Sequence, residues 1–192
     1  SMSTEPDYEE SIVVNVGDWV ERAKTDPVAY LERQATELFL ATLATIEPYR
    51  TSTFLKGGIL MGVVYESHRQ TGDIDLTTIL EPKQGVAEEF TQAFREPICA
   101  VRIIKMAPDE YLFRAYSLSD LIAEKIRALL QQESRNRYRR QDFYDLSILI
   151  NQSTFNDPER KQVYETLLKK CHARDIEPTR SSLPQPEVRR RA

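Results

Sequence analysis

The chain has 192 residues, of which 41% are apolar, and its formal net charge is −4. This length favours one domain with room for a small helical appendage, and the acidic balance argues against non-specific binding along nucleic acids. No apolar run approaches the roughly 18–20 residues that span a bilayer, and the acidic N-terminal segment does not resemble a signal peptide. Cys99 and Cys171 are isolated in the sequence. We therefore expect a cytoplasmic protein with no disulfide framework, no zinc site and no membrane partner.

The first quarter of the chain contains the start signals of two helices. Ahead of them, we expect residues 1–16 to form an acidic, flexible leader. A short helix containing Trp19 follows, and Asp18 is its predicted cap. Asp26-Pro27 is a typical N-cap and first-turn pair, and it predicts a longer helix that ends before Pro48.

A pair of glycines marks the first candidate site. Residues 53–56 are predicted to form a short strand and residues 59–66 an apolar helix, with Gly57 and Gly58 between them. Glycines at a strand-to-helix turn let backbone N–H groups approach a phosphate, and the positive end of the helix favours the anion. The turn therefore predicts a phosphate-binding site; a plain tight turn is the more common reason for a glycine pair.

Two acidic residues follow, two positions apart, on the next predicted strand. Alternate residues of a strand point to the same side, so Asp73, Asp75 and Thr77 share one face. Two carboxylates roughly 6–7 Å apart repel each other, and Mg²⁺ binds to one or two carboxylates together with substrate phosphates. This spacing predicts a metal–nucleotide site. Arg69 precedes the acids and is expected to neutralise them or to contact the phosphates; a surface arginine is the alternative.

With the remaining elements, the order of helices and strands predicts an α/β fold of the mixed α+β type. A helix is predicted over residues 86–94, strands over Ile98–Met106 and Tyr111–Tyr116, and helices over residues 118–132, 141–151 and 158–172. This order predicts a small mixed sheet flanked by helices, with further helices at the C-terminal end. We expect four parts: the leader 1–16, a core 17–116, C-terminal helices 117–175 that complete the site, and a tail 176–192.

Charged residues lie on the predicted apolar faces of two C-terminal helices. In the helix over residues 118–132, Lys125 lies within the apolar arc, where an ammonium must reach solvent or find an anion. In the next helix Asp142 lies within the arc, and Asp145 lies at its edge; the apolar residues of that arc are Phe143, Leu146, Leu149 and Ile150. We therefore expect Lys125 and Asp142 to meet, either in a catalytic site or in a structural ion pair.

Three segments, in this order, resemble the AbiEii/AbiGii-type nucleotidyltransferases of the DNA-polymerase-β-like superfamily: LKGGILMGVVY…RQTGDIDLTTI, SLSDLIAEKIRALLQQ and RRQDFYDLSILI. The resemblance extends from about Phe54 to Ile150 and implies a nucleotidyltransferase-like fold. It implies the following site residues: Gly57 and Gly58 for the triphosphate of an NTP, Asp73 and Asp75 for Mg²⁺, and Lys125 and Asp142 for catalysis, with Asp145 as a neighbour. Lys56 and Arg69 are further candidates for nucleotide binding.

The resemblance also implies a function. The implied function is that of a Mg²⁺-dependent toxin that moves a nucleoside monophosphate from an NTP to a hydroxyl of a tRNA or protein. The resemblance also implies an antitoxin protein as partner. The basic segment Arg135–Arg140 fits an RNA acceptor, and a solvated loop explains it equally well. Many relatives carry an arginine where this chain has Gln141, and the predicted strand Ile98–Met106 offers no third carboxylate. A catalytically silent module that binds a nucleotide or a protein is therefore the alternative hypothesis.

Overall fold

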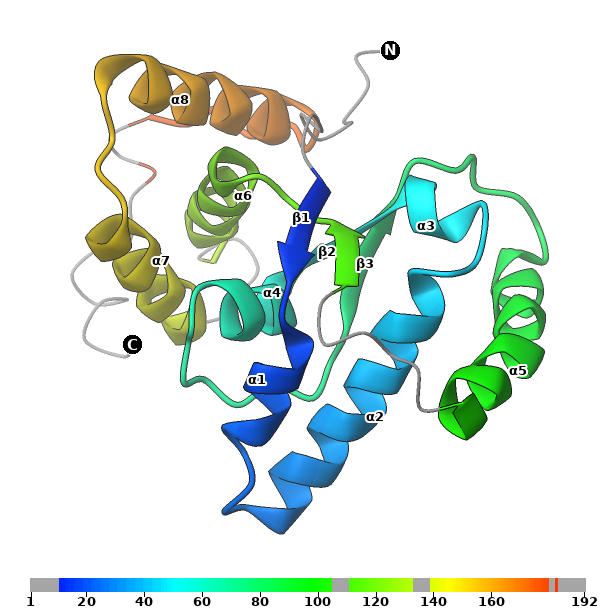
Figure 1. Ribbon diagram of the computed structural model, residues 1–192. Coiled ribbons are helices and arrows are strands. Elements are labelled where there is room, and N and C mark those ends of the chain that lie inside the picture. The colour runs from blue at the N-terminus through cyan, green and yellow to red at the C-terminus, as the bar shows by residue number, and fades with distance from the viewer. Residues whose placement is uncertain (1–10, 105–110, 133–138, 180–181, 183–192) are drawn as a thin grey trace. The chain divides into compact units, whose positions relative to one another are not determined.

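The computed structural model describes residues 11–104, 111–132, 139–179 and 182 (Figure 1). The chain divides into two compact units between Ala115 and Tyr116. The N-terminal unit comprises the described residues up to Ala115, and the C-terminal unit comprises those from Tyr116 onward.

Short strands and helices are interspersed along the N-terminal unit. Its strands are β1 (Ser11–Val14), β2 (Thr53–Lys56), β3 (Asp75–Thr78) and β4 (Tyr111–Arg114). Its helices are α1 (Val16–Glu21), α2 (Pro27–Leu43), α3 (Tyr49–Ser52), α4 (Gly57–Val64) and α5 (Val86–Ile104). The predicted strand over residues 53–56 is confirmed, and the helix predicted over residues 59–66 begins at the glycine pair itself.

The strands form two short antiparallel ladders, β1–β4 and β2–β3. In the second ladder Lys56 pairs with Asp75 and Phe54 pairs with Thr77. A parallel bridge between Leu55 and Ala115 connects β2 to the residue that follows β4. The predicted mixed α/β fold, with small sheets among helices, is confirmed; the strands form two antiparallel pairs connected by one parallel bridge.

The two N-terminal helices begin at side-chain caps. Asp26 accepts hydrogen bonds from the backbone N–H groups of Val28 and Ala29, both at 3.1 Å, as the Asp26-Pro27 pair predicts. For α1 the predicted cap is wrong, because Asn15 is the N-cap and accepts from the N–H of Asp18 at 3.0 Å. The helix begins at Val16, so Asp18 lies inside its first turn rather than at the cap.

Helix α4 is the centre of the N-terminal core, and every residue from Gly58 to Val63 is buried. Trp19 of α1 packs against it at Gly62, where a Cβ atom would lie 2.8 Å from the indole nitrogen. Arg22 of the same helix donates to the carbonyl of Gly62 at 2.9 Å. The small residue at position 62 therefore sets how closely α1 approaches α4.

Helices α2 and α5 meet through aromatic rings. Phe39 of α2 stacks on Phe94 of α5 with ring centroids 4.9 Å apart, and Phe90 packs against Phe94 at 4.6 Å. The strand predicted over Ile98–Met106 is wrong, because α5 continues through Pro97 to Ile104; residues 105–110 lie outside the described residues. In the sequence, Phe90, Phe94, Ile98 and Val101 are spaced by four, four and three residues, which is the helical period.

The predicted leader overlaps a strand. Residues 11–14 form β1 and pair with residues 111–114 of β4. Residues 1–10 lie outside the described residues. The polar, acidic composition of this segment favoured the prediction of a flexible leader. Local composition carries no information about a strand partner that lies far away in the sequence.

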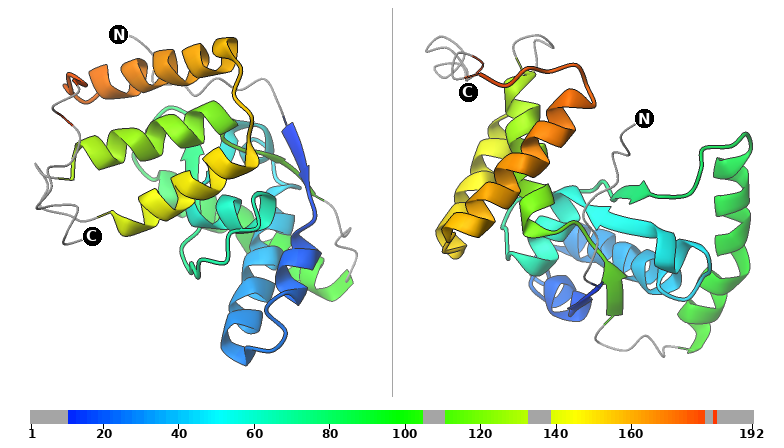
Figure 2. Two further views of the ribbon diagram at one scale, coloured as in Figure 1. Left: turned by 90° about the vertical axis from the view of Figure 1, so that its left-hand side faces the viewer. Right: turned by 90° about the horizontal axis from the view of Figure 1, so that it is seen from above.

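The C-terminal unit consists of α6 (Leu118–Leu130), α7 (Arg140–Gln152) and α8 (Asp157–His172). Helix α6 lies between the other two and packs against both (Figures 1 and 2). Ser117 caps α6, and Asn156 and Glu159 form a capping box at the start of α8. The three predicted C-terminal helices are confirmed. Within the described ranges, no helix combines the length and apolar character needed to cross a membrane.

A buried ion pair joins α6 to α8. The ammonium of Lys170 lies 3.0 Å from the carboxylate of Asp120, whose side chain is only 1% exposed. The same ammonium lies over the ring of Tyr116, 4.8 Å from its centroid. Ser117 donates to the other carboxylate oxygen of Asp120 at 3.0 Å.

Replacing Lys170 by Met should destabilise the protein by about 3–5 kcal/mol, because the buried carboxylate of Asp120 would lose its ammonium. Lys161 provides a matched control on the same helix, since its pair with Glu165 is 3.8 Å long and both side chains are mostly exposed. Lys161→Met should change stability by less than about 1 kcal/mol. Urea unfolding of both variants measures the difference, and equal stabilities would contradict the importance of the buried pair.

Candidate active site

The candidate site in the N-terminal unit begins at the turn between β2 and α4. Gly57 has a φ of +69°, a left-handed conformation that side chains other than glycine adopt with strain. The N-cap residue of α4 is Lys56, whose side chain has no acceptor with which to cap the helix. The N–H groups of the first turn are therefore suited to an anion, and the helix dipole favours negative charge there.

Asp75 lies directly beside this turn. It pairs with Lys56 in the β2–β3 ladder, and its carboxylate is in contact with Gly57, so that a Cβ on that glycine would overlap it. The Asp75 Cβ lies 2.8 Å from the position that a Gly57 Cβ would occupy. Gly57 therefore has two reasons to be glycine: its backbone conformation and the carboxylate packed against it.

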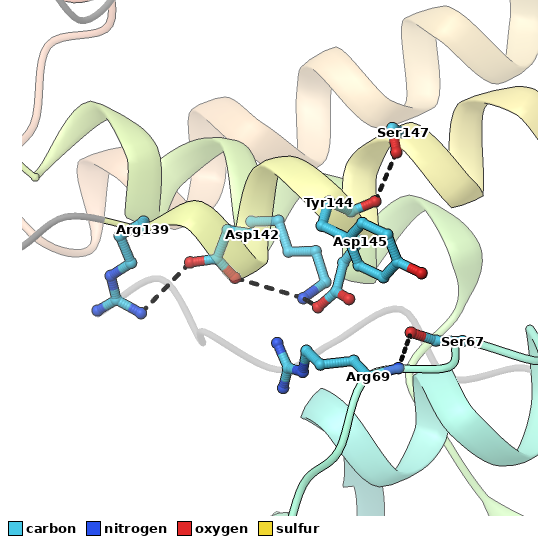
Figure 3. Close-up of polar contacts among 8 residues, drawn as sticks. Ser67, Arg69, Arg139, Asp142, Tyr144, Asp145 and Ser147 are labelled. Carbon is cyan, nitrogen blue, oxygen red and sulfur yellow. Dashed lines mark hydrogen bonds and ion pairs between the residues drawn. The ribbon is translucent and has the colours of Figure 1, made fainter. Parts of the chain in front are cut away.

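Gly58 is enclosed in the same way by the loop that leads to β3. The guanidinium of Arg69 lies where a Gly58 side chain would begin, and the Thr71 hydroxyl oxygen is 2.6 Å from that point. The backbone N–H of Arg69 donates to the Ser67 hydroxyl at 3.4 Å, which holds the start of the loop (Figure 3). A cationic fork and a hydroxyl thus adjoin the glycine turn, a set of donors that matches phosphate oxygens.

Asp73 has a different setting from Asp75. Strand β3 begins at Asp75, so Asp73 precedes the strand rather than lying on it as predicted. Both side chains are exposed. Among the described residues, no group of three or more His, Cys, Asp or Glu side chains is arranged to hold a metal ion. Two accessible carboxylates, one of them packed against the glycine turn, still fit Mg²⁺, which takes its remaining ligands from substrate phosphates and water.

The second cluster lies within the C-terminal unit, between α6 and α7. The ammonium of Lys125 lies 2.6 Å from the carboxylate of Asp145 and 3.3 Å from that of Asp142. Lys125 is 8% exposed and Asp145 is 0% exposed, so this is a buried ion pair. Arg139 reaches the other oxygen of Asp142 at 3.4 Å, and Figure 3 shows it beside Asp142 on α7. The predicted meeting of Lys125 and Asp142 is confirmed, but Asp145 is the closer partner.

The buried face of α7 differs from the prediction. Leu146 and Leu149 are buried as expected, whereas Phe143 and Ile150 are 41% and 54% exposed. The inward residues are Asp142, Asp145, Leu146 and Leu149, which are spaced i, i+3, i+4 and i+7 along one helical stripe. The two carboxylates turn inward because the buried Lys125 needs an anion, and this need outweighs the burial of two further apolar side chains.

The sequence candidates thus form two sets. In the N-terminal unit, Gly57, Gly58, Arg69 and Asp75 adjoin one another. In the C-terminal unit, Lys125 contacts Asp142 and Asp145. Gln141 is exposed, and of the basic segment Arg135–Arg140 only Arg139 and Arg140 lie within the described residues.

Thr71 is the residue that sequence reasoning missed. It adjoins Gly58 almost as closely as Arg69 does, yet a single threonine in a polar loop carries no distinguishing pattern. The only available signal was its position between Arg69 and Asp73, two residues from each.

Comparison with models of known protein families gives a match. The family model described as nucleotidyl transferase AbiEii toxin, type IV toxin–antitoxin system, matches residues 38–108 and 89–192, which together cover most of the chain. Neither a comparison with curated proteins nor one with solved structures gives a significant match. The matched residues include both clusters and every segment that carries the resemblance seen in the sequence. The chain therefore belongs to the AbiEii family of nucleotidyltransferase toxins of type IV toxin–antitoxin systems.

Proposed function

We propose that this nucleotidyltransferase uses Mg²⁺ to move a nucleoside monophosphate from an NTP to a hydroxyl of a tRNA or protein acceptor. We also propose that it acts in the cytoplasm as a toxin and that an antitoxin protein is its partner. The observation that carries the proposal is the crowding at the glycine pair, where a carboxylate contacts Gly57 and a guanidinium contacts Gly58. A turn that excludes side chains and adjoins both charges suits a metal-bound triphosphate.

The phosphate-binding role belongs to the turn and to Arg69. Backbone N–H groups at the start of α4 would donate to phosphate oxygens, and the planar guanidinium of Arg69 would donate two further hydrogen bonds. Lys56 ends β2 next to the turn and would add a second positive charge. These groups would hold the NTP in one orientation, which is the main requirement of phosphoryl transfer.

Asp73 and Asp75 are the residues that would hold the metal. When bound, Mg²⁺ would neutralise the negative charge of the triphosphate and of the transferring phosphoryl group. Without it, two carboxylates next to a phosphate-binding turn would repel the substrate. The carboxylate of Asp75 would be held in position by its contact with Gly57 and by its place in the β2–β3 ladder.

Lys125 would stabilise the negative charge that develops during transfer. Asp145 would orient it, because the 2.6 Å contact fixes the ammonium at the end of a flexible side chain. Asp142 is less buried than Asp145 and is shared between Lys125 and Arg139. It is therefore the better candidate to accept a proton from the acceptor hydroxyl.

One observation favours a second function. The ammonium of Lys125 already lies between two carboxylates, as in a purely structural ion pair. A protein of this kind would bind an NTP or a partner protein at the glycine turn without transferring anything. Transfer experiments separate the two functions directly.

Purified protein should transfer label from one of the four NTPs to total tRNA or to a protein acceptor, in a reaction that requires Mg²⁺. Asp73→Asn and Asp75→Asn should lose transfer and stay folded, because both side chains are exposed and each change removes a repelling charge. Glu88→Gln, an exposed acid on α5, is the matched control and should retain full activity. Wild-type rates in both Asn variants would refute the metal assignment.

Lys125 and Asp145 can be tested as a pair. Lys125→Met should lose activity and about 3–5 kcal/mol of stability, because it leaves the Asp145 carboxylate buried without its ammonium. The double variant Lys125→Met/Asp145→Leu replaces both charges by apolar groups and should recover most of that stability.

Transfer by the double variant should remain reduced by about a hundredfold or more, as expected when a group that stabilises developing charge is removed. Urea unfolding and label transfer are measured on the same samples. Near wild-type transfer by the refolded double variant would show that the pair is structural.

Expression in a bacterial host should slow growth, because transfer to a component of translation would block protein synthesis. Asp75→Asn is the paired control and should leave growth unaffected at the same protein level. Equal inhibition by the wild type and by Asp75→Asn would contradict toxicity by nucleotide transfer, while leaving the transferase chemistry itself open to the labelling experiment.

A further inference from the structure

A pocket of about 320 Å³ lies within the N-terminal unit, beside the glycine turn. Its walls come from α1, from the first half of α2 and from the loop over residues 69–72. The residues that matter are Trp19, Glu32, Arg33, Arg69, Gln70 and Thr71. The volume is at the lower end of the range of ligand pockets, so it suits a small ligand or one part of a larger ligand.

The pocket is connected to the glycine turn by two of its own walls. Arg69 and Thr71 both line the pocket, and both are in contact with Gly58. A nucleotide whose phosphates lie on the turn would therefore have the pocket within reach of its other end. The proposed function leaves this end of the substrate unassigned.

Arg33 provides a flat surface in the pocket wall. Its guanidinium lies over the indole of Trp19, 4.7 Å from the ring centroid, and donates to the Trp19 carbonyl at 2.5 Å. These contacts hold the guanidinium against the indole. Because Arg33 also lines the pocket, the face of its guanidinium away from the indole would be the one that meets a ligand. Burial, followed by the charge of Arg22, lowers the pKa of Arg33, so an electron-rich partner on that face would offset lost hydration.

We propose that this pocket binds the base of a nucleotide, stacked on Arg33. Arginine planes stack on nucleobases in RNA-binding proteins, and an indole behind the plane extends the stack. Glu32 would accept a hydrogen bond from an exocyclic amino group, and the amide of Gln70 would donate or accept at the base edge. The inference rests on the proposed function, since the pocket adjoins the turn that would hold the triphosphate of the NTP. The base belongs either to the NTP or to the terminal nucleotide of an RNA acceptor.

The protein contains one tryptophan, so its fluorescence reports this pocket directly. The full chain is titrated with each NTP, with inorganic tripolyphosphate and with tRNA, all in Mg²⁺, while calorimetry measures binding. At least one NTP should bind and change the emission of Trp19, whereas tripolyphosphate should bind without changing it. A change with tRNA alone would assign the base to the acceptor, which supports the same pocket chemistry.

The substitution Arg33→Lys keeps the positive charge and removes the planar guanidinium group. It should weaken binding of the responsive nucleotide about tenfold and leave the dissociation constant of tripolyphosphate unchanged. The matched control is Arg95→Lys, at an exposed arginine on α5. It should change neither the dissociation constant of the nucleotide nor that of tripolyphosphate. Thermal melting checks that both variants are folded. The fluorescence experiment uses the wild-type protein alone and does not depend on either variant.

Two negative results are distinguishable. Calorimetric NTP binding with no emission change from NTP or tRNA, and with wild-type affinity in Arg33→Lys, would overturn the pocket assignment and leave the transferase intact. No binding of any NTP, together with no label transfer, would overturn the proposed function and this inference with it.

Discussion

The absence of side chains at two consecutive positions is the constraint on which the N-terminal site depends. Gly57 must adopt a left-handed backbone and must leave room for the carboxylate of Asp75. Gly58 must leave room for Arg69 and Thr71. Even an alanine at either position would displace a charged group from the turn. The β2–β3 register keeps this arrangement in place, because it sets Asp75 opposite Lys56, the last residue before the glycines.

The C-terminal unit depends on buried charge rather than on missing side chains. Helix α6 is joined to α7 by Lys125 and to α8 by Asp120, and each of these pairs contains a carboxylate that is almost fully buried. Buried ion pairs contribute little net stability compared with apolar packing, but a wrong alignment leaves a charge buried alone. Such pairs therefore specify how α6 is rotated between its neighbours. The same device holds the ammonium of Lys125 in one position, which suits a residue proposed to act on a substrate.

Arg69 and Thr71 both adjoin Gly58, and both also line the pocket beside α2. A phosphate on the turn and a base in the pocket would therefore be bound by the same short loop. Ordering of that loop by one end of the nucleotide would reduce the entropic cost of binding the other end. Selection among NTPs and positioning of the triphosphate would in this way be coupled through residues 69–72.

The sequence by itself determined the local elements and the identity of the family. Gly57-Gly58 and the inward position of Lys125 are recorded in short-range patterns, because turns and helical periodicity act over a few residues. Tertiary structure decided the rest. Strand β1 needed a partner about 100 residues away, α5 continued through β-branched residues as far as Ile104, and α7 buried Asp145 while leaving Phe143 and Ile150 exposed. Thr71 joined the site only through folding. In each case the deciding energy is a contact between distant segments, which no local pattern contains.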